Sequence, residues 1–171
     1  MDQNKAIKFL YNLSSKLNKF YKSNSKKKLI INNKSKRKKI FNPVTNFDKS
    51  FEKMIRAYIV KSFPDDGIIG EEFKEKKTKN KNYWIIDPID GTSNFVYGIP
   101  YFSISIAVEA EGDIVAGVVA DLSSNDTFDA VKGQGSRCNN EVITVNDNDS
   151  LESAIVTTGF SYRPERREIQ G

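Results

Sequence analysis

Apolar side chains recur at helical spacing in two stretches of the first sixty-three residues. Such residues stand every three or four positions between Ile7 and Tyr21, which predicts an amphipathic helix there. The same spacing returns after Thr45 and Asn46, either of which suits an N-cap, and continues until Pro64. We therefore expect two helices, the second of which is closed by the turn at residues 64–67.

The pattern then changes to short β-rich stretches that are separated by Gly, Asn and Asp. We expect strands at 83–87, 102–110, 113–121, 127–131, 141–145 and 153–158, with a further short strand near 29–31. Pro164, at an early position in 163–168, predicts the first turn of another helix. Two helices followed by sequential strands indicate an α+β fold, in which the helices pack on one face of a mainly antiparallel sheet.

The amino-acid composition excludes several classes of catalytic and metal site. The 171 residues, enough for one domain or part of a larger one, include no His, which excludes a Ser-His-Asp triad and His-ligated zinc or iron. The single Cys138 can form no internal disulfide, and we expect it to be a small buried or turn residue.

The chain has no apolar run long enough to span a bilayer, and the N-terminus carries charges where a signal peptide would be apolar. We therefore expect a cytoplasmic protein without a membrane contact.

The net charge of +5 comes from one basic segment, residues 26–39, which holds eight Lys and Arg and no acid. Such a run can contact phosphate, nucleic acid or an anionic surface. It can equally be a solvated strand and loop. The second interpretation is favoured because no aromatic side chains are interleaved for stacking on bases. We therefore do not expect nucleic acid as the main partner.

The candidate chemistry lies in residues 84–95, WIIDPIDGTSNF, preceded by 69–73, IGEEF. The apolar stretch places Asp87 at a strand end, Pro88 is expected to stop the strand, and Gly91 permits a sharp turn after Asp90. Carboxylates that face one spot repel each other unless a cation lies between them. With oxygen ligands only, hard cations such as Mg²⁺ or Mn²⁺ are favoured.

The residues after Asp90 predict an anion site. Gly91, Thr92 and Ser93 can open a short helix whose free N–H groups point at a phosphate. Metal ions and amide donors together suit phosphoryl transfer. The motifs of haloacid-dehalogenase phosphatases, Cys-phosphatases and P-loop proteins are absent from the sequence.

These residues resemble the signature of the inositol monophosphatase family, within the lithium-sensitive, Mg²⁺-dependent sugar phosphatase superfamily. The resemblance rests on GEE, WIIDPIDGTSNFVYGIPYFSISIAV and PVTNFD, and further on GVV, KGQGSRCNN and TTGFSYRPERR, so that it covers most of residues 42–168. It implies that the chain is the N-terminal part of a layered α/β/α/β/α fold.

The resemblance also implies site residues. The metal ligands would be Glu71, Asp87, the carbonyl of Ile89 and Asp90, binding two or three Mg²⁺ ions, with Mn²⁺ as a substitute. The catalytic residues would be Glu71 and Thr92, which activate the attacking water, with Asp48 in the same network. Asp90, Gly91 and Thr92 would bind the substrate. Asn94 and Phe95 are expected to be structural, Glu72 is left unassigned, and Arg37–Lys39 match a mobile loop near a third metal.

The same resemblance predicts what the chain lacks. Family members carry a further Asp in a W-D-x-A-A-G-like motif of a C-terminal α/β half, which nothing here matches. Residues 92–95, TSNF, favour inositol monophosphate as the substrate, with sugar or nucleotide phosphatase activity (fructose-1,6-bisphosphatase, histidinol-phosphate or 3′,5′-bisphosphate nucleotidase type) as the alternative. A homodimer is implied. A rival hypothesis is a non-catalytic homologue that binds nucleic acid through residues 26–39.

Overall fold

Two amphipathic helices open the chain. In the computed structural model, which describes residues 2–35 and 41–157, α1 spans Gln3–Asn24 and α2 spans Asn46–Ser62. The Asp2 side chain accepts hydrogen bonds from the first backbone amides of α1, and Thr45 caps α2. Both predicted helices are confirmed: α1 extends beyond residues 7–21 at both ends, whereas α2 ends at Ser62, one residue before the last apolar position, Phe63.

The strands of the described residues form a seven-stranded sheet and a separate two-stranded ribbon. In the sheet, the spatial order follows the chain order from β3 to β9. Its strands are β3 (Gly67–Gly70), β4 (Asn82–Asp90), β5 (Ser103–Ala110), β6 (Asp113–Asp121), β7 (Thr127–Val131), β8 (Ser136–Cys138) and β9 (Glu141–Ile143). Among the described strand pairs, only β3 and β4 are parallel, so the predicted mainly antiparallel α+β sheet is confirmed. The ribbon pairs β1 (Ile31–Asn33) with β2 (Pro43–Thr45).

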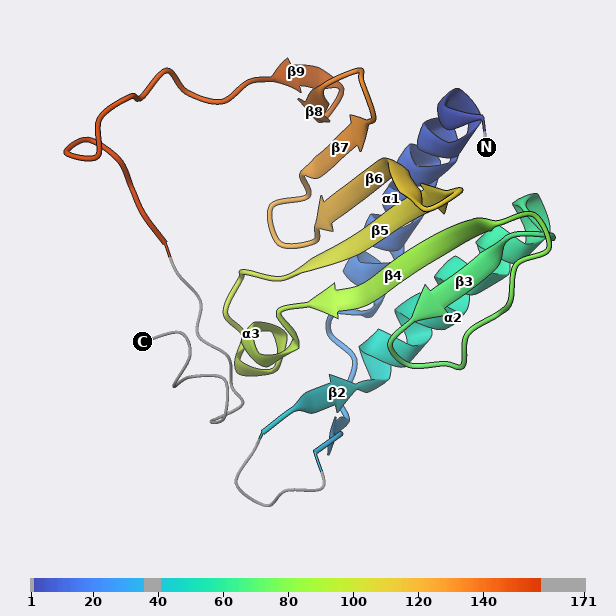
Figure 1. Cartoon of the computed structure of the whole chain (residues 1–171). Coiled ribbons are helices and arrows are strands. Elements are labelled where there is room, and N and C mark those ends of the chain that lie inside the picture. The colour runs from blue at the N-terminus through green and yellow to red at the C-terminus, as the bar shows by residue number, and fades with distance from the viewer. Residues whose placement is uncertain (1, 36–40, 158–171) are drawn as a thin grey trace.

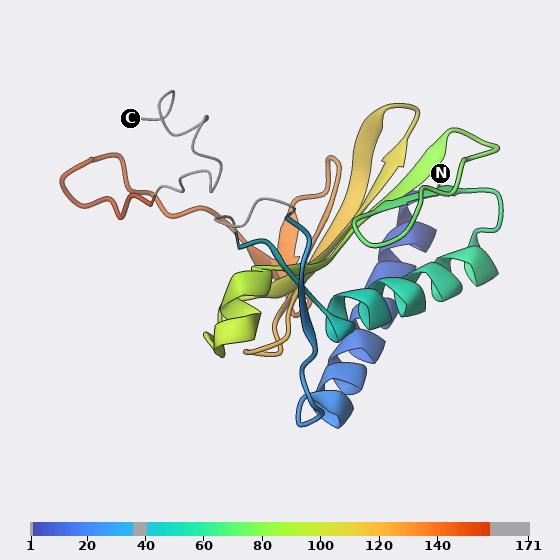
Figure 2. The same cartoon turned by 90° about the horizontal axis from the view of Figure 1, so that it is seen from below.

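Both long helices pack on the same face of the sheet (Figures 1 and 2). The core lies between the sheet and the two helices. It consists of the strand residues that face the helices and of one apolar face of each helix. Its largest fully buried apolar side chains are Trp84, Phe51, Leu10, Leu13, Leu17, Ile55, Ile59, Ile68, Ile89, Ile104 and Ile106. The buried Trp84 indole donates to Asp66 Oδ2 at 2.8 Å, which satisfies its N–H. The opposite face of the sheet carries no helix among the described residues (Figure 2).

Several predicted boundaries were wrong. Pro88 does not end its strand, because β4 continues to Asp90 through a register shift between Asp87 and Asp90, and a bulge tolerates a residue without an N–H. The strand predicted at 153–158 does not form over its described residues, 153–157, and the strand predicted at 141–145 stops at Ile143. Cys138 is a half-buried strand residue rather than a turn residue.

The short strands β2, β3 and β8 were not predicted, since three or four residues are too few to show a period. The helix expected at 163–168 and the loop residues Arg37–Lys39 lie outside the described residues.

The short helix α3 (Thr92–Tyr97) follows β4 directly, as the sequence predicts. Gly91, at its N-cap, has a φ of +83°, and a Cβ there would lie 2.9 Å from the carbonyl oxygen of Tyr101. Both facts require glycine at this turn. Within the described ranges, none of the helices combines the length and apolarity that crossing a bilayer requires.

Candidate functional site

The parallel pairing of β3 with β4 brings two acidic segments together. In this register Gly70, the last residue of β3, lies opposite Ile86, so Glu71 leaves the sheet beside Asp87, which is still part of β4. Parallel strands end at the same edge of a sheet, whereas the neighbouring antiparallel strand β5 begins there. The pairing therefore places Glu71 beside Asp87 although sixteen positions of sequence separate them.

The bulge at the end of β4 shapes the next part of the site. The Asp87 carboxylate accepts a hydrogen bond from the amide of Ile89 at 3.2 Å, so it folds back over Pro88 and stabilises the bulge. Asp90 is exposed at the strand end. The carbonyl of Ile89 accepts from the Thr92 hydroxyl at 2.9 Å. The bulge thus directs a carbonyl oxygen and two carboxylates to one edge.

Asp48 lies on the first turn of α2 and is fully buried. Its Oδ2 accepts from the amide of Thr45 at 2.7 Å and from the Thr45 hydroxyl at 2.6 Å, as part of a capping box. Its Oδ1 lies 3.3 Å from the Thr92 hydroxyl. The Thr92 hydroxyl has one proton, so it donates to Asp48 or to Ile89 but not to both at once. Asp48 and Thr92, separated by 44 positions, therefore form one network.

Lys34 reaches the acidic edge from the segment after β1. Its ammonium donates to Glu71 Oε2 at 3.1 Å and forms an ion pair with Glu72. Burial alone lowers the pKa of Lys34, but the hydrogen bonds to Glu72 and Glu71 outweigh it and raise the pKa above its ordinary value. Burial raises the pKa of the nearly buried Glu72. A cation of the chain itself thus lies between two of the carboxylates.

Asp87 is held in surroundings that oppose its charge. Burial is the largest cause, followed by the nearby Glu71 and Asp90 carboxylates, and together they raise the pKa of Asp87 to about 7. Burial also raises the pKa of Asp48, although hydrogen bonds from Thr45 partly oppose this. The acidic groups therefore lie close enough to destabilise each other's charge.

The donor chemistry of this edge fits a hard divalent cation, because carboxylate and carbonyl oxygens are the available ligands. No three carboxylate or thiol side chains within residues 2–35 and 41–157 converge closely enough to hold one ion together. The chain supplies the predicted oxygen donors at one edge without a closed coordination cage. The assignment of Glu71, Asp87, Ile89 and Asp90 as metal ligands stays a prediction.

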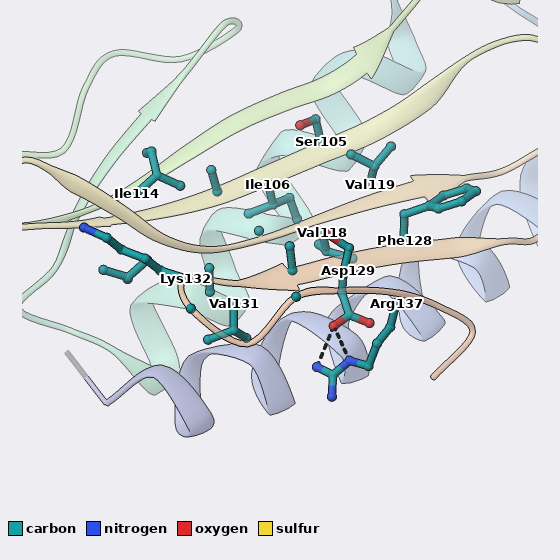
Figure 3. A pocket seen from close by; sticks show the side chains of 18 of the residues that line it. Ser105, Ile106, Ile114, Val118, Val119, Phe128, Asp129, Val131, Lys132 and Arg137 are labelled. Carbon is teal, nitrogen blue, oxygen red and sulfur yellow. Dashed lines mark hydrogen bonds and ion pairs between the residues drawn. The ribbon is translucent and has the colours of Figure 1, made fainter. Parts of the chain in front are cut away.

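A cavity of about 460 Å³ borders the site and is lined in part by Asp90, Gly91 and Asn94. Asn94 donates to the carbonyl of Tyr101 at 2.7 Å, and Phe95 packs edge-to-face on Phe102, in agreement with their predicted structural roles. A larger cavity of about 760 Å³ lies on the sheet face that the long helices leave uncovered (Figure 3).

Apolar side chains of β6 and β7 line much of that larger cavity, and the ion pair of Asp129 with Arg137 stands at its margin (Figure 3). Its lining includes none of the predicted site residues.

Two residues near the site were missed from the sequence. Glu52 is completely buried on α2, and its position among the apolar residues of the buried helix face was a usable signal. Lys34 offered none, because it is one of eight basic residues in the segment 26–39. The described part of that segment places Lys26–Lys28 in an exposed connection after α1.

Comparison with known proteins gives consistent results. The model of the inositol monophosphatase family matches residues 2–170. The chain is 43% identical over 124 residues to Nus factor SuhB of Pasteurella multocida (strain Pm70), covering 72% of this chain and 46% of that protein. It is 45% identical over 116 residues to the fructose-1,6-bisphosphatase/inositol-1-monophosphatase of Thermotoga maritima, covering 68% and 44%.

Among solved structures, the fold is similar to that of the extragenic suppressor protein suhB from Bartonella henselae. The TM-score is 0.76 at 29% sequence identity, and the match covers 83% of this chain and 54% of that one. The chain thus spans about half the length of the relatives that it matches.

Proposed function

The chain belongs to the inositol monophosphatase family, and from this premise we propose that it is part of a Mg²⁺-dependent hydrolase of phosphate monoesters. The observation that carries the proposal is the close approach of Glu71 and Asp90 to Asp87, whose pKa is raised to about 7 by burial first and by these two carboxylates second. A site that opposes ionisation so strongly is stabilised by a bound cation. Structural ion pairs can also perturb a pKa, but here the crowded groups coincide with the family motif.

In this proposal Glu71, Asp87, the Ile89 carbonyl and Asp90 hold two or three Mg²⁺ ions, for which Mn²⁺ can substitute. When bound, such ions lower the pKa of a water molecule and offset charge on the leaving oxygen. The chain's own part is to present these oxygens at one edge. The β3–β4 pairing and the bulge at Pro88 do this.

Hydrogen bonds support the remaining roles in the proposal. Asp48, fixed by Thr45, lies within reach of the Thr92 hydroxyl, and we propose that Thr92 and Glu71 orient the attacking water. The turn at Gly91 exposes the first amides of α3, which have no partner inside the helix. With the Thr92 hydroxyl, these amides would donate to the phosphate of the substrate, and Asp90 would also contact the substrate.

Inositol monophosphate is the proposed substrate, since residues 92–95 read TSNF as in inositol monophosphatases. A related sugar or nucleotide phosphate is the alternative, and one relative is named both a fructose-1,6-bisphosphatase and an inositol-1-monophosphatase. A homodimer is part of the proposal, and sedimentation of the purified chain at several concentrations tests it.

The test of the proposed function is phosphate release from inositol 1-phosphate by the purified chain, with Mg²⁺ and with EDTA, beside an Asp87→Asn variant. We expect Mg²⁺-dependent release that falls by about 100-fold or more in the variant, because a ligand charge is lost. The matched control is Asp113→Asn, which removes an exposed carboxylate paired with Lys132. The specificity is tested by phosphate release from three further substrates: fructose 1,6-bisphosphate, histidinol phosphate and a 3′,5′-bisphosphate nucleotide.

Near-normal turnover by Asp87→Asn would contradict the metal assignment. Absence of release in the wild-type chain would contradict activity of these 171 residues alone, as expected either for part of a longer enzyme or under the non-catalytic hypothesis. Binding of RNA or DNA that weakens steeply with salt would then support that hypothesis.

A further inference from the structure

Glu52 is a glutamate in a place where glutamate is rarely found. It lies on α2 with no exposed surface, between Phe51 and Ile55 of the helix core. Acidic side chains are almost never fully buried unless they are paired, because removal of a carboxylate from water is costly. Its burial therefore requires partners that use both of its oxygens.

Each oxygen of the Glu52 carboxylate has a hydrogen-bond partner. Oε1 accepts from Arg56 Nε at 2.7 Å, one turn along the same helix, and Oε2 accepts from the backbone amide of Glu72 at 2.7 Å. Arg56 continues to the same segment, since its Nη2 donates to the carbonyl of Phe73 at 3.2 Å and its guanidinium lies over the Phe73 ring. The pair thus holds the backbone of the two residues that follow Glu71.

The residue before Glu71 is fitted to the same carboxylate. A Cβ on Gly70 would lie 2.2 Å from Glu52 Oε1, so only glycine leaves room for Glu52 at this point. The carboxylate is therefore enclosed by Gly70 on one side of Glu71 and by the Glu72 amide on the other. Both neighbours of Glu71 are located by one buried group.

The contacts of Glu52 support a segment that lies just outside the sheet, because β3 ends one residue before Glu71. The β3–β4 ladder ends at Gly70, and the Glu71 side chain is about half exposed, with the Lys34 ammonium as a contact. The Glu52 hydrogen bond continues the backbone support where the ladder ends. The same helix carries Asp48 one turn earlier, so α2 positions one site residue directly and another through its backbone.

We propose that Glu52, supported by Arg56, is a positioning residue that sets the Glu71 backbone so that the Glu71 carboxylate is directed at the metal site. The inference rests on the proposed function, since it concerns how the site binds its ion. A buried pair that served only to stabilise the fold would leave metal affinity unchanged in a variant that still folds.

The test is binding of Mn²⁺ alone to the purified chain, followed through the electron paramagnetic resonance signal of free Mn²⁺. In Glu52→Gln the size is kept, but the amide N–H₂ must face one of the two donors. We expect the Mn²⁺ dissociation constant to rise about 10- to 100-fold, as for other residues that orient metal ligands. The control Glu75→Gln makes the same change three residues after Glu72, at an exposed side chain paired with Lys77, and should bind Mn²⁺ like wild type.

A second readout requires no metal. Amide hydrogen exchange at Glu72 should be faster in Glu52→Gln than in wild type, because its acceptor is weakened. Thermal unfolding confirms that each variant is folded. If Glu52→Gln does not fold, Arg56→Lys replaces it, and we expect a several-fold weaker Mn²⁺ affinity because Lys cannot bridge Glu52 and Phe73 as a planar fork does.

Unchanged Mn²⁺ affinity in a folded Glu52→Gln or Arg56→Lys variant, beside a wild-type chain whose binding Asp87→Asn abolishes, would overturn the positioning role alone. A wild-type chain that binds no Mn²⁺ would overturn the proposed function, and the positioning role with it. Weakened binding in Glu52→Gln but not in Glu75→Gln would support both.

Discussion

At the scale of single residues, Asp87 joins the local chain conformation to the chemistry of the site. Its carboxylate supports the bulge through the Ile89 amide and at the same time faces Glu71 and Asp90. The residue types of this site are readable from the motif. Its contacts with residues distant in sequence are not, because they depend on how β3 and α2 pack against β4.

The raised pKa of Asp87 predicts a pH dependence of stability. Between the ordinary value of 3.8 and about 7 the folded chain keeps a proton on Asp87 that the unfolded chain has lost, so the free energy of unfolding falls as pH rises through this window. An asparagine at this position cannot ionise, so Asp87→Asn does not lose stability in this way. In thermal unfolding with EDTA, the melting temperature of the variant relative to wild type should therefore rise from pH 4 to pH 7 and stay constant above pH 7.

A difference in melting temperature between Asp87→Asn and wild type that stays constant from pH 4 to pH 8 would contradict the raised pKa.

Thr92 permits a second prediction at this scale. Its hydroxyl contacts Asp48 and Ile89 but is not one of the proposed metal ligands. Thr92→Ala should lower turnover about 10- to 100-fold while Mn²⁺ affinity changes little, since a water-orienting hydroxyl contributes chiefly to the transition state. Thr92→Ser, which keeps the hydroxyl, should retain most activity. Equal losses of turnover and metal affinity in Thr92→Ala would contradict this division of roles.

At the scale of elements, α2 and the β3–β4 pair determine the geometry. Helix α2 was predictable because seventeen residues show a clear apolar period and a capping residue. Strand β3 was not, since four residues show no period, yet its parallel pairing is what places Glu71 beside Asp87. The continuation of β4 through Pro88 was also missed, because a bulge depends on the partner strand rather than on the proline alone.

The N-cap of α2 gives a prediction for the helix and the site together. The Thr45 hydroxyl accepts from the amide of Phe47 at 3.1 Å and donates to Asp48 at 2.6 Å. Thr45→Ala should lower the free energy of unfolding by about 1 kcal/mol, the usual cost of losing such a cap, and should also reduce turnover by freeing Asp48. Urea unfolding followed by circular dichroism measures the first effect.

Thr45→Ser restores the hydroxyl and should restore both properties. A Thr45→Ala variant as stable as wild type would show that the capping box does not hold α2.

At the scale of the whole molecule, the two faces of the sheet differ. The long helices cover one face, whereas the other leaves apolar side chains in contact with water, among them Ile114, Val119 and Phe128. Contiguous apolar surface of this kind is uncommon on isolated proteins and is typical of contact surfaces. In the described residues, helices therefore cover only one of the two faces of the sheet.

This asymmetry predicts dye binding by the native chain. A dye that fluoresces on contact with apolar surface, such as anilinonaphthalene sulfonate, should bind without denaturant. Val119→Ser with Phe128→Ser should reduce its fluorescence severalfold while the melting temperature changes little. Val60→Ser makes a similar change at an exposed position of α2 and should leave the fluorescence unchanged. Wild-type chain that does not enhance the fluorescence would contradict an accessible apolar face.

The sequence by itself determined the two long helices, the mainly antiparallel sheet and the family, and it supplied the candidate site residues. These depend on local periodicity and on a long contiguous motif, both of which are properties of neighbouring positions. Only the tertiary structure decided that Glu71 lies beside Asp87, that Lys34 pairs with Glu71 and Glu72, and that Glu52 is buried beneath their backbone. These contacts join residues far apart in the chain, and their energies depend on strand register and burial, which no short stretch of sequence contains.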